Sequence, residues 1–372
     1  MHQLLFEGPG VVRWAEAEEP TLDDVDGGRS GRGGGAGRGG GGSIEGNGAP
    51  LEQVPGPGAA VVRPIAVALC DLDVGVLRGD FPLPGPYPLG HEGVAEVVAI
   101  GPAVRSIRVG DRVIVPFQIS CGECAPCRRG RTGNCALHPP MSTFGLGTMG
   151  GLQWGGLLAD RALVPHADGM LVRLPNDVDP VAVASMGDNI ADGWRCVGPQ
   201  LAEEPRAHVL VVAGDAGPNS IGLYAAGLAV AAGSERVVYL DDDPERGALA
   251  EALGAEVLTG PPPRRVGSFP ITVDASGSSE GLCCALESTA SDGRCTSPSV
   301  YLGDQAVPML SMYSRCCTLH TGRAHARPAI PEVLDLVAAG FDPSIVTTDV
   351  VEFADAEAAL AEPSMKPVLV RP

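Results

Sequence analysis

The sequence predicts a two-domain α/β protein, with a mostly β N-terminal half followed by a doubly wound parallel sheet. Its 372 residues exceed what one core usually holds, at roughly 150 residues per domain. Up to about residue 183, short apolar runs alternate with Gly-Asp and Gly-Pro turns, which is typical of β-strands. After that point, Ala-rich helical stretches alternate with short apolar runs, which is the pattern of βαβ units.

The N-terminal half is predicted to contain short strands interrupted by one glycine-dominated segment, at about 23–58. That segment holds too little apolar surface to offset the entropy of ordering it, so we expect a disordered surface loop. An RNA-binding arginine–glycine segment would need more aromatic or arginine repeats than it has. The predicted strands are 4–6, 10–14, 60–70, 90–101, 108–116, 158–165 and 171–175.

The C-terminal half is predicted to alternate strands and helices, beginning with a buried strand at 208–214 and an apolar helix at 220–232. The tail after an amphipathic helix at 331–340 returns to short β and helical pieces. The remaining predicted elements are strands at 236–241, 271–276 and 298–303 and a helix at 244–254.

The net charge and the cysteine content indicate which classes of partner and which compartment to expect. The formal net charge is 26 − 45 = −19, which opposes binding to nucleic acid and to anionic membrane surfaces. No apolar run approaches the roughly 18 residues of a membrane helix. Eleven cysteines and a start, Met1–Glu7, without a basic region or long apolar core indicate a reducing compartment, so we expect a cytoplasmic protein.

Four cysteines, Cys121, Cys124, Cys127 and Cys135, lie within fifteen residues. Two-residue gaps place adjacent ligands on a turn, and the longer gap lets the backbone return with a fourth, which suits a closed tetrahedral zinc site. A disulfide cluster is the alternative, but gaps this short strain most pairings. The spacing therefore predicts a structural zinc lobe at 121–135, which supports folding and carries no chemistry.

A glycine-rich turn follows the strand at 208–214, where phosphate would meet the N–H groups of a helix N-terminus. It departs from G-x-G-x-x-G by extra residues. The candidate contacts are Gly214, Gly217, Ser220, Ile221 and Gly222.

Asp241 ends the next predicted strand, where a carboxylate can accept the ribose hydroxyls of NAD and repel the 2′-phosphate of NADP. The alternative is a helix cap, a role that Asp242 or Asp243 could also fill. Arg246 is the first arginine after Asp241 and is separated from it by four residues, so no offsetting charge is expected at the ribose. The sequence favours NAD.

Taken together, Cys70-x-x-Asp73, Gly90-His91-Glu92, the four-cysteine lobe and the βαβ core resemble the zinc-dependent medium-chain alcohol dehydrogenases. The resemblance covers nearly the whole chain outside the glycine-rich insert, and the step of 91 − 70 = 21 residues from Cys70 to His91 matches the family pattern. It implies a GroES-like catalytic domain at 1–183, a Rossmann NAD-binding domain at 184–330 and a C-terminal segment, 331–372, that returns to the catalytic domain.

By this resemblance, Cys70 and His91 bind a catalytic zinc ion in the cleft, and Asp73 orients His91. Glu92 lies next to the metal, where it can ligate transiently. Asp188 stands where many relatives carry a cysteine ligand, and an aspartate there resembles the glutathione-independent formaldehyde dehydrogenase branch. A cap at the start of a helix is the alternative for Asp188. The turn at Ala275-Ser276 resembles the segment that backs the nicotinamide, although an ordinary turn fits equally well.

The resemblance implies an oxidoreductase that transfers a hydride between an alcohol or aldehyde and NAD(H), with two Zn²⁺ per chain, as a homo-oligomer (dimer or tetramer). Leu72 departs from it, because relatives often have Ser or Thr there to relay the alcohol proton. This departure and the lengthened glycine turn keep a second hypothesis open. It is a zinc-stabilised, catalytically degraded relative that binds nucleotide or a partner.

Overall fold

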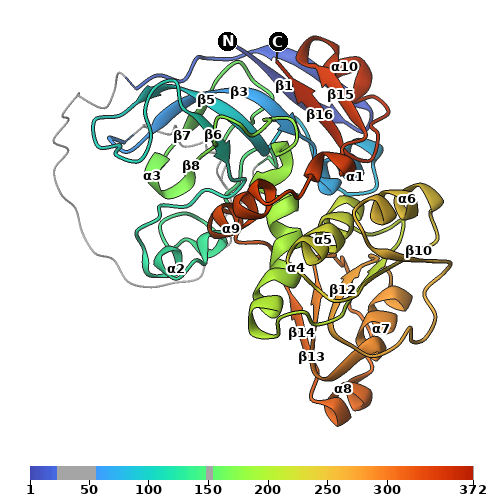
Figure 1. The fold of residues 1–372 in the computed structure, drawn as a ribbon. Helices are drawn as coiled ribbons and strands as arrows, with labels where there is room; N and C mark the ends of the chain where they lie inside the picture. Colours follow the sequence, from blue (N-terminus) through green and yellow to red (C-terminus); the bar gives the residue numbers. More distant parts are fainter. Residues whose placement is uncertain (23–55, 148–153, 372) are drawn as a thin grey trace, which may run out of the picture.

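The computed structural model describes residues 1–22, 56–147 and 154–371. The glycine-rich insert predicted at about 23–58 therefore lies outside the described residues, except for 56–58. Two β systems built mainly from the N-terminal half occupy the upper part of Figure 1, and a parallel sheet with its helices occupies the lower part. The α/β fold class predicted from the sequence is confirmed.

The larger N-terminal sheet has seven strands in the order β15–β16–β3–β5–β6–β8, with β7 paired to β3. Its central strands β3 and β5 are antiparallel, and Ala68 lies opposite Glu92. The end of β3 and the start of β5 therefore lie side by side. The bounds are β3 Ala60–Ala68, β5 Glu92–Ile100, β6 Arg112–Val115, β7 Ala162–Val164, β8 Val172–Arg173, β15 Asp349–Glu352 and β16 Pro367–Val370.

A smaller sheet, β2–β1–β4, packs against the first through a core that includes Phe6, Val67, Leu69 and Leu158. Short helices connect the strands of this half. The bounds are β1 His2–Gly8, β2 Val11–Glu16, β4 Tyr87–Pro88, α1 Asp71–Arg78, α2 Ala125–Arg128, the 3₁₀ turn η2 Thr132–Asn134 and α3 Ala167–Met170.

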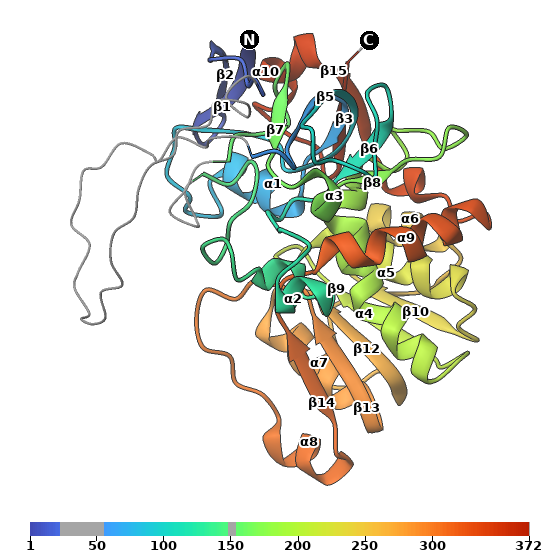
Figure 2. The ribbon, with the colours of Figure 1, turned by 90° about the vertical axis from the view of Figure 1, so that its left-hand side faces the viewer.

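The second half contains a six-stranded sheet in the order β11–β10–β9–β12–β13–β14, in which each neighbouring pair is parallel (Figure 2). The strand order reverses between β9 and β12, which is where doubly wound sheets bind ligands. The bounds are β9 Val209–Ala213, β10 Val237–Asp241, β11 Glu256–Thr259, β12 Phe269–Ala275, β13 Thr289–Ser297 and β14 Thr318–Thr321.

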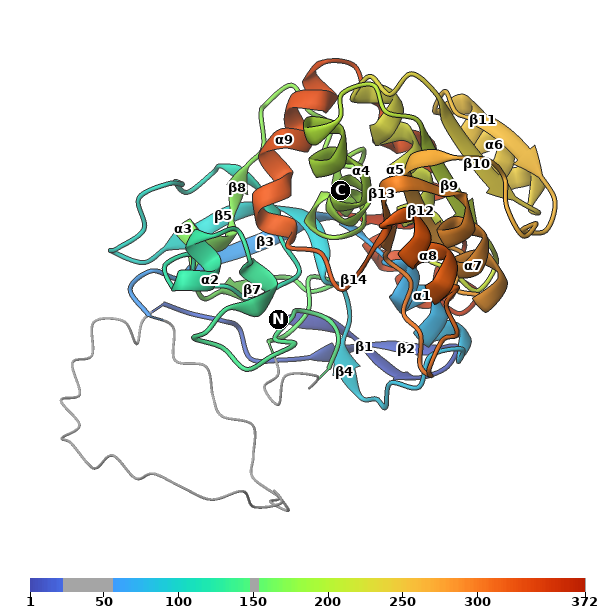
Figure 3. The ribbon, with the colours of Figure 1, turned by 90° about the horizontal axis from the view of Figure 1, so that it is seen from below.

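Helices cover both faces of this sheet, as Figures 1 and 3 show. Strand β9 is apolar throughout because Val209 and Val211 pack against one helical layer and Leu210 and Val212 against the other. The first layer holds α4 Asn189–Glu203, α5 Asn219–Ala231, α6 Pro244–Ala252 and α9 Ala326–Ala338; the second holds α7 Ser279–Ser288 and α8 Met309–Arg315.

The C-terminal strands rejoin the N-terminal sheet, since β16 pairs antiparallel with β3 and β15 pairs parallel with β16. A 3₁₀ turn, η5 Phe353–Asp355, and the short helix α10 Ala356–Ala359 lie between them, and a further 3₁₀ turn, η4 Pro343–Val346, precedes them. The domain boundaries at 183/184 and 330/331 remain predictions. Among the described residues, no helix combines the length and apolarity needed to cross a membrane.

One predicted strand is wrong. Residues 298–303 are irregular, with Val300 63% and Leu302 70% exposed, and the fifth strand of the sheet is β13, which ends before Pro298. Proline lacks the N–H that a ladder hydrogen bond needs, and β13 has a polar sequence without the apolar signature of a buried strand. The last helix also begins earlier than predicted, at Ala326, with Pro331 inside it.

Candidate metal centres and dinucleotide cleft

The antiparallel register of β3 and β5 brings Cys70 and His91 together, since Cys70 follows one strand and His91 precedes the other. Cys70 is also the N-cap residue of α1. Its sulfur accepts a hydrogen bond from Leu72 N (3.4 Å), and Asp73 Oδ2 accepts one from Cys70 N (3.1 Å). This capping box fixes the Cys70 side chain and the Asp73 carboxylate in one local structure.

Asp188 occupies the N-cap position of α4, but its side chain makes no capping hydrogen bond. Its Oδ2 instead lies 3.2 Å from His91 Nε2. One ligand atom from each of Cys70, His91 and Asp188 lies within 4.8 Å of the others, and all three residues are buried. A tetrahedral zinc ion would hold its nitrogen and oxygen ligands about 3.3 Å apart, so this donor set fits zinc.

The other ring nitrogen of His91, Nδ1, lies 3.3 Å from Asp73 Oδ2, close to it but not aligned as a hydrogen bond. Burial lowers the pKa of His91, whereas the charge of Asp73 and the contact with Asp188 raise it, and the net result is a pKa well above the usual value. Burial also raises the pKa of the Cys70 thiol. A divalent cation would supply the positive charge that a buried thiolate here requires.

Behind the three candidate ligands lies a buried polar network that the sequence did not predict. Lys366, fully buried, donates to Glu92 Oε1 (2.6 Å), to Leu69 O (2.7 Å) and to Asn189 Oδ1. Glu92 Oε2 accepts from Asn189 N (2.9 Å). Both carboxylate oxygens of Glu92 are therefore engaged away from the ligand cluster, and its role as a transient ligand stays a prediction.

Asn189 links this network to the candidate ligands, because its Nδ2 lies 3.2 Å from Cys70 Sγ and 3.3 Å from Asp188 Oδ2. Burial raises the pKa of Glu92 to about 7, although the charge of Lys366 opposes that shift. Lys366 is the only lysine in the sequence, a compositional oddity that could have marked it.

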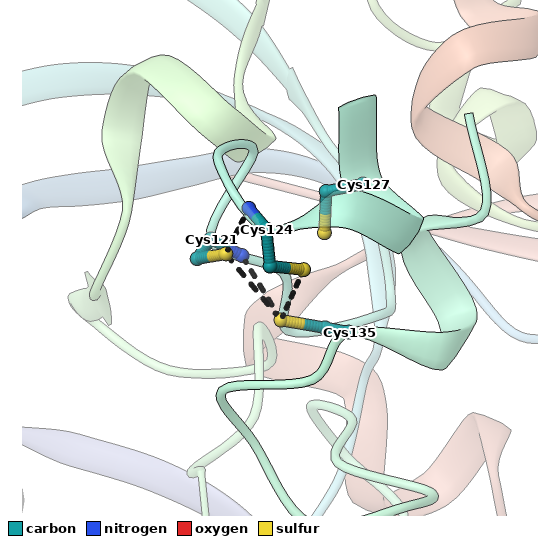
Figure 4. A group of neighbouring side chains, drawn as sticks. All are labelled: Cys121, Cys124, Cys127 and Cys135. Carbon is teal, nitrogen blue, oxygen red and sulfur yellow. Dashed lines mark hydrogen bonds between the residues drawn. The ribbon is translucent and has the colours of Figure 1, made fainter. Parts of the chain in front are cut away.

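The four-cysteine lobe brings the sulfurs of Cys121, Cys124, Cys127 and Cys135 toward one another (Figure 4). Cys135 Sγ lies 3.6 Å from Cys121 Sγ and 3.9 Å from Cys124 Sγ. Four sulfurs around zinc at about 2.3 Å would be about 3.8 Å apart, so the geometry fits the ion. Hydrogen bonds from backbone N–H groups of Ala136 and Cys127 lower the pKa of Cys124 to about 6, which favours a thiolate.

The glycine turn after β9 packs directly on the turn after β12, at the switch point of the parallel sheet. A Cβ on Gly217 would lie 1.8 Å from Ala275 O, so only glycine permits this approach. A Cβ on Gly214 would lie 3.3 Å from Ser276 O, and one on Gly222 would lie 3.0 Å from Ala275 Cβ. The structure therefore places five of the predicted cofactor residues side by side, and their contact with NAD stays a proposal.

Asp241 ends β10 as predicted, but its carboxylate is already fully hydrogen-bonded. Arg246, in the first turn of α6, donates from Nε to Oδ2 and from Nη2 to Oδ1, each at 2.7 Å. Tyr239 Oη and Asp243 N supply further donors to Asp241. The prediction that no arginine offsets this charge is wrong, because one turn of helix carries Arg246 back over the end of the strand. The capping role belongs to Asp243, which accepts from Glu245 N and Arg246 N.

A second carboxylate that the sequence did not single out lies at the N-terminus of α5. Asp71 Oδ1 accepts from Ser220 N (3.1 Å), and Oδ2 accepts from Ser220 Oγ (2.7 Å) and Ile221 N (3.4 Å). These are two of the backbone N–H groups predicted to receive a pyrophosphate. An internal carboxylate thus occupies the anion-binding position of the helix.

Comparison with known proteins agrees with this arrangement. Residues 56–176 match the model of the alcohol dehydrogenase GroES-like domain. Geraniol dehydrogenase of Castellaniella defragrans is 30% identical over 346 residues, which cover 80% of this chain and 89% of that one. Glutathione-independent formaldehyde dehydrogenase of Pseudomonas aeruginosa is 34% identical over 204 residues, which cover 53% of this chain and 49% of that one.

Among solved structures, the alcohol dehydrogenase TADH of Thermus sp. ATN1 superposes over 100% of both chains, with a TM-score of 0.81 and 25% sequence identity. A GroES-like domain, a doubly wound sheet and two clusters of candidate metal ligands occur together here, and the named relatives are oxidoreductases. The chain belongs to the zinc-dependent medium-chain alcohol dehydrogenase family.

Proposed function

We propose that this protein is a zinc-dependent oxidoreductase that transfers a hydride between an alcohol or aldehyde substrate and NAD(H). The observation that supports it most is the convergence of Cys70, His91 and Asp188 in a buried cluster next to the first turn of α4. Bound there, zinc and NAD would supply a Lewis acid for the substrate oxygen and a hydride acceptor. A second zinc ion would be held by the four-cysteine lobe.

In this proposal the protein's own residues position the reactants. Asp73 Oδ2 lies 3.3 Å from His91 Nδ1, and Nε2 on the other side of the ring is directed at the ligand cluster. Lys366 and Asn189 hold Glu92 away from it. Leu72 packs against the core of the N-terminal half and has no hydroxyl, so a proton from the substrate must leave by water, by Asp73 or through a cofactor hydroxyl.

NAD is the proposed nucleotide, because Asp241 places a carboxylate at the end of β10, where a 2′-phosphate would be repelled. The bidentate contact with Arg246 weakens that repulsion. The preference for NAD over NADP should therefore be smaller than the roughly hundredfold ratio of kcat/KM expected for an unpaired carboxylate. The test is a direct comparison of kcat/KM for the two nucleotides. Equal kcat/KM values for NAD and NADP would show that Asp241 does not contact the ribose.

A homo-oligomer is proposed from an exposed apolar patch around α8, defined as Val300, Leu302, Met309, Leu310 and Tyr313. Their exposed fractions are 63%, 70%, 65%, 81% and 82%. Large apolar side chains exposed on neighbouring segments often mark a surface that a symmetric partner covers. All eleven cysteines are unpaired, which supports a reducing, cytoplasmic setting.

A catalytically degraded relative remains the second candidate, favoured by Asp71 on the N-terminus of α5 and by Leu72. One experiment separates the two. Purified protein is assayed for zinc content and for NADH formation, by absorbance, with a panel of alcohols and with formaldehyde. Two zinc ions per chain and turnover that is lost in His91→Ala support the oxidoreductase. One zinc ion, lost in Cys121→Ser, and no turnover support the degraded relative.

A further inference from the structure

A pocket of about 260 Å³ lies at the carboxyl end of β14, between residues 320–325 and residues 133–134 of the four-cysteine lobe. It lies at the edge of the parallel sheet, three strands from β9 and its glycine turn. The dinucleotide residues discussed above do not line it. What this pocket accepts can be inferred from the side chains around it.

The charged side chains that line the pocket are basic or imidazole. Arg323 donates from Nη2 to Gly133 O (3.1 Å), and His325 Nδ1 accepts from Gly133 N (3.1 Å). Because Nδ1 is an acceptor, the proton of neutral His325 is on Nε2, which is left as a donor. Within the described part of the chain, no carboxylate forms an ion pair with Arg323, His320 or His325. In a chain of net charge −19 this is an unusual concentration of unopposed donors.

Arg195 lies on α4, the helix whose Ala191 packs with Ala324 of the pocket segment. Its Nε donates to Asp192 Oδ1 (2.5 Å), and its side chain is 12% exposed. Its Nη1 and Nη2 are buried and have no acceptor among the described residues. A buried donor without a partner is unfavourable, so an acceptor beside Arg195 would be stabilising. Burial and then the charge of Arg195 lower the pKa of both His320 and His325.

The pocket is linked to the candidate catalytic cluster through two adjacent residues. Gln118 Nε2 donates to Ala324 O (2.5 Å) in the segment that lines the pocket. The ring of Phe117, the preceding residue, lies 5.9 Å from the ring of His91, centroid to centroid. The Phe117–Gln118 segment therefore contacts both the candidate catalytic cluster and the segment that lines the pocket.

We propose that this pocket is an oxyanion subsite, which receives a carboxylate or phosphate group carried by the substrate alcohol or aldehyde. Arg323 and the Nε2–H group of His325 would bind the oxyanion, and Arg195 would stabilise its charge from behind. The inference names the substrate class of the proposed oxidoreductase and rests on that function. The anion binding itself can be measured without turnover.

The binding test uses inorganic sulfate and acetate at constant ionic strength, with the melting temperature and calorimetric titration as readouts. Wild type should be stabilised by at least one of the two anions. Arg323→Gln should bind it at least tenfold more weakly. Arg264→Gln is the control, because it removes the same charge from an exposed side chain, 88% exposed, outside the pocket. Equal anion binding by wild type and Arg323→Gln would overturn the subsite.

The kinetic test compares 4-hydroxybutyrate and glycerol 3-phosphate with uncharged 1-butanol and glycerol, in the zinc-loaded protein with NAD. A carboxylate subsite predicts a lower KM for 4-hydroxybutyrate than for 1-butanol, and a phosphate subsite predicts a lower KM for glycerol 3-phosphate than for glycerol. In either case the advantage should fall at least tenfold in Arg323→Gln and persist in Arg264→Gln. Turnover of the uncharged alcohols alone would overturn the subsite and leave the proposed function standing. No turnover of any substrate, with Arg323-dependent anion binding intact, would count against the oxidoreductase alone.

Discussion

Asp71→Asn should strengthen NADH binding, because the Asp71 carboxylate now occupies the backbone N–H groups that a pyrophosphate would use. Asp71 accepts from Ser220 N at 3.1 Å and from Ile221 N at 3.4 Å. A dinucleotide at the N-terminus of α5 must displace this carboxylate or bind next to it. Asparagine keeps the size and one acceptor oxygen of the side chain and removes its charge.

The expected magnitude follows from Coulomb's law. A phosphate that contacts the same N–H groups would lie roughly 5 Å from the Asp71 carboxylate, and at an effective dielectric constant of about 20 the repulsion is about 3 kcal/mol. At about 1.4 kcal/mol per decade, the dissociation constant of NADH should fall by about a hundredfold. Burial raises the pKa of Asp71, whereas the charge of Lys366 and the hydrogen bonds from Ser220 oppose that shift.

The assay is a fluorescence titration of NADH, with Asp80→Asn as the control. Asp80 is exposed and lies just after the same helix, α1, so its substitution removes an equal charge that does not touch α5. The control should bind NADH as wild type does. If Asp71→Asn binds NADH no better than wild type, the pyrophosphate does not use the N-terminus of α5 and the proposed cofactor placement is wrong.

Three further predictions concern folding and assembly. Cys124→Ser should cost one zinc ion per chain and lower the melting temperature markedly, since a closed site contributes directly to folding; unchanged melting with lost turnover would contradict it. Lys366→Met should destabilise the fold by about 3–5 kcal/mol in urea unfolding, because Glu92 is left buried and unpaired, and Glu92→Gln in the same chain should restore most of that loss; equal stability of the single and double variants would refute the pairing. Leu310→Glu should convert the proposed oligomer to a monomer in light scattering, whereas Leu137→Glu, at a leucine 63% exposed just after the four-cysteine lobe, should not; an unchanged mass would place the interface elsewhere.

The sequence predicted the parts of the site that depend on spacing within one local segment. The four cysteines lie on a short loop, so their gaps alone indicate a tetrahedral cluster. Strand β9 and its glycine turn follow from an apolar run and the backbone freedom of glycine. Cys70, His91 and Asp188 required the family resemblance, because residues 188 − 91 = 97 positions apart meet only through tertiary structure.

The features that the sequence did not predict depend on contacts made only in the folded chain. Arg246 was placed too far from Asp241, although the first turn of α6 brings its guanidinium within 2.7 Å of the carboxylate. The role of Asp71 could not be predicted from the sequence, because its hydrogen-bond partner Ser220 is 149 positions away. β13 was missed because its polar sequence is stabilised by pairing with β12 and β14 rather than by its own composition.

The last strand of the chain has a role beyond closing the sheet. β16 pairs with β3, and Lys366, the residue before β16, enters the buried network around Glu92 and Asn189. Pairing Val368 with Ala68 places the base of β16 beside the end of β3, from which Cys70 emerges. The ammonium group of Lys366 can therefore pair with Glu92 only after β16 has paired with β3. Docking of this strand and neutralisation of the carboxylate behind the candidate ligands should be one cooperative event.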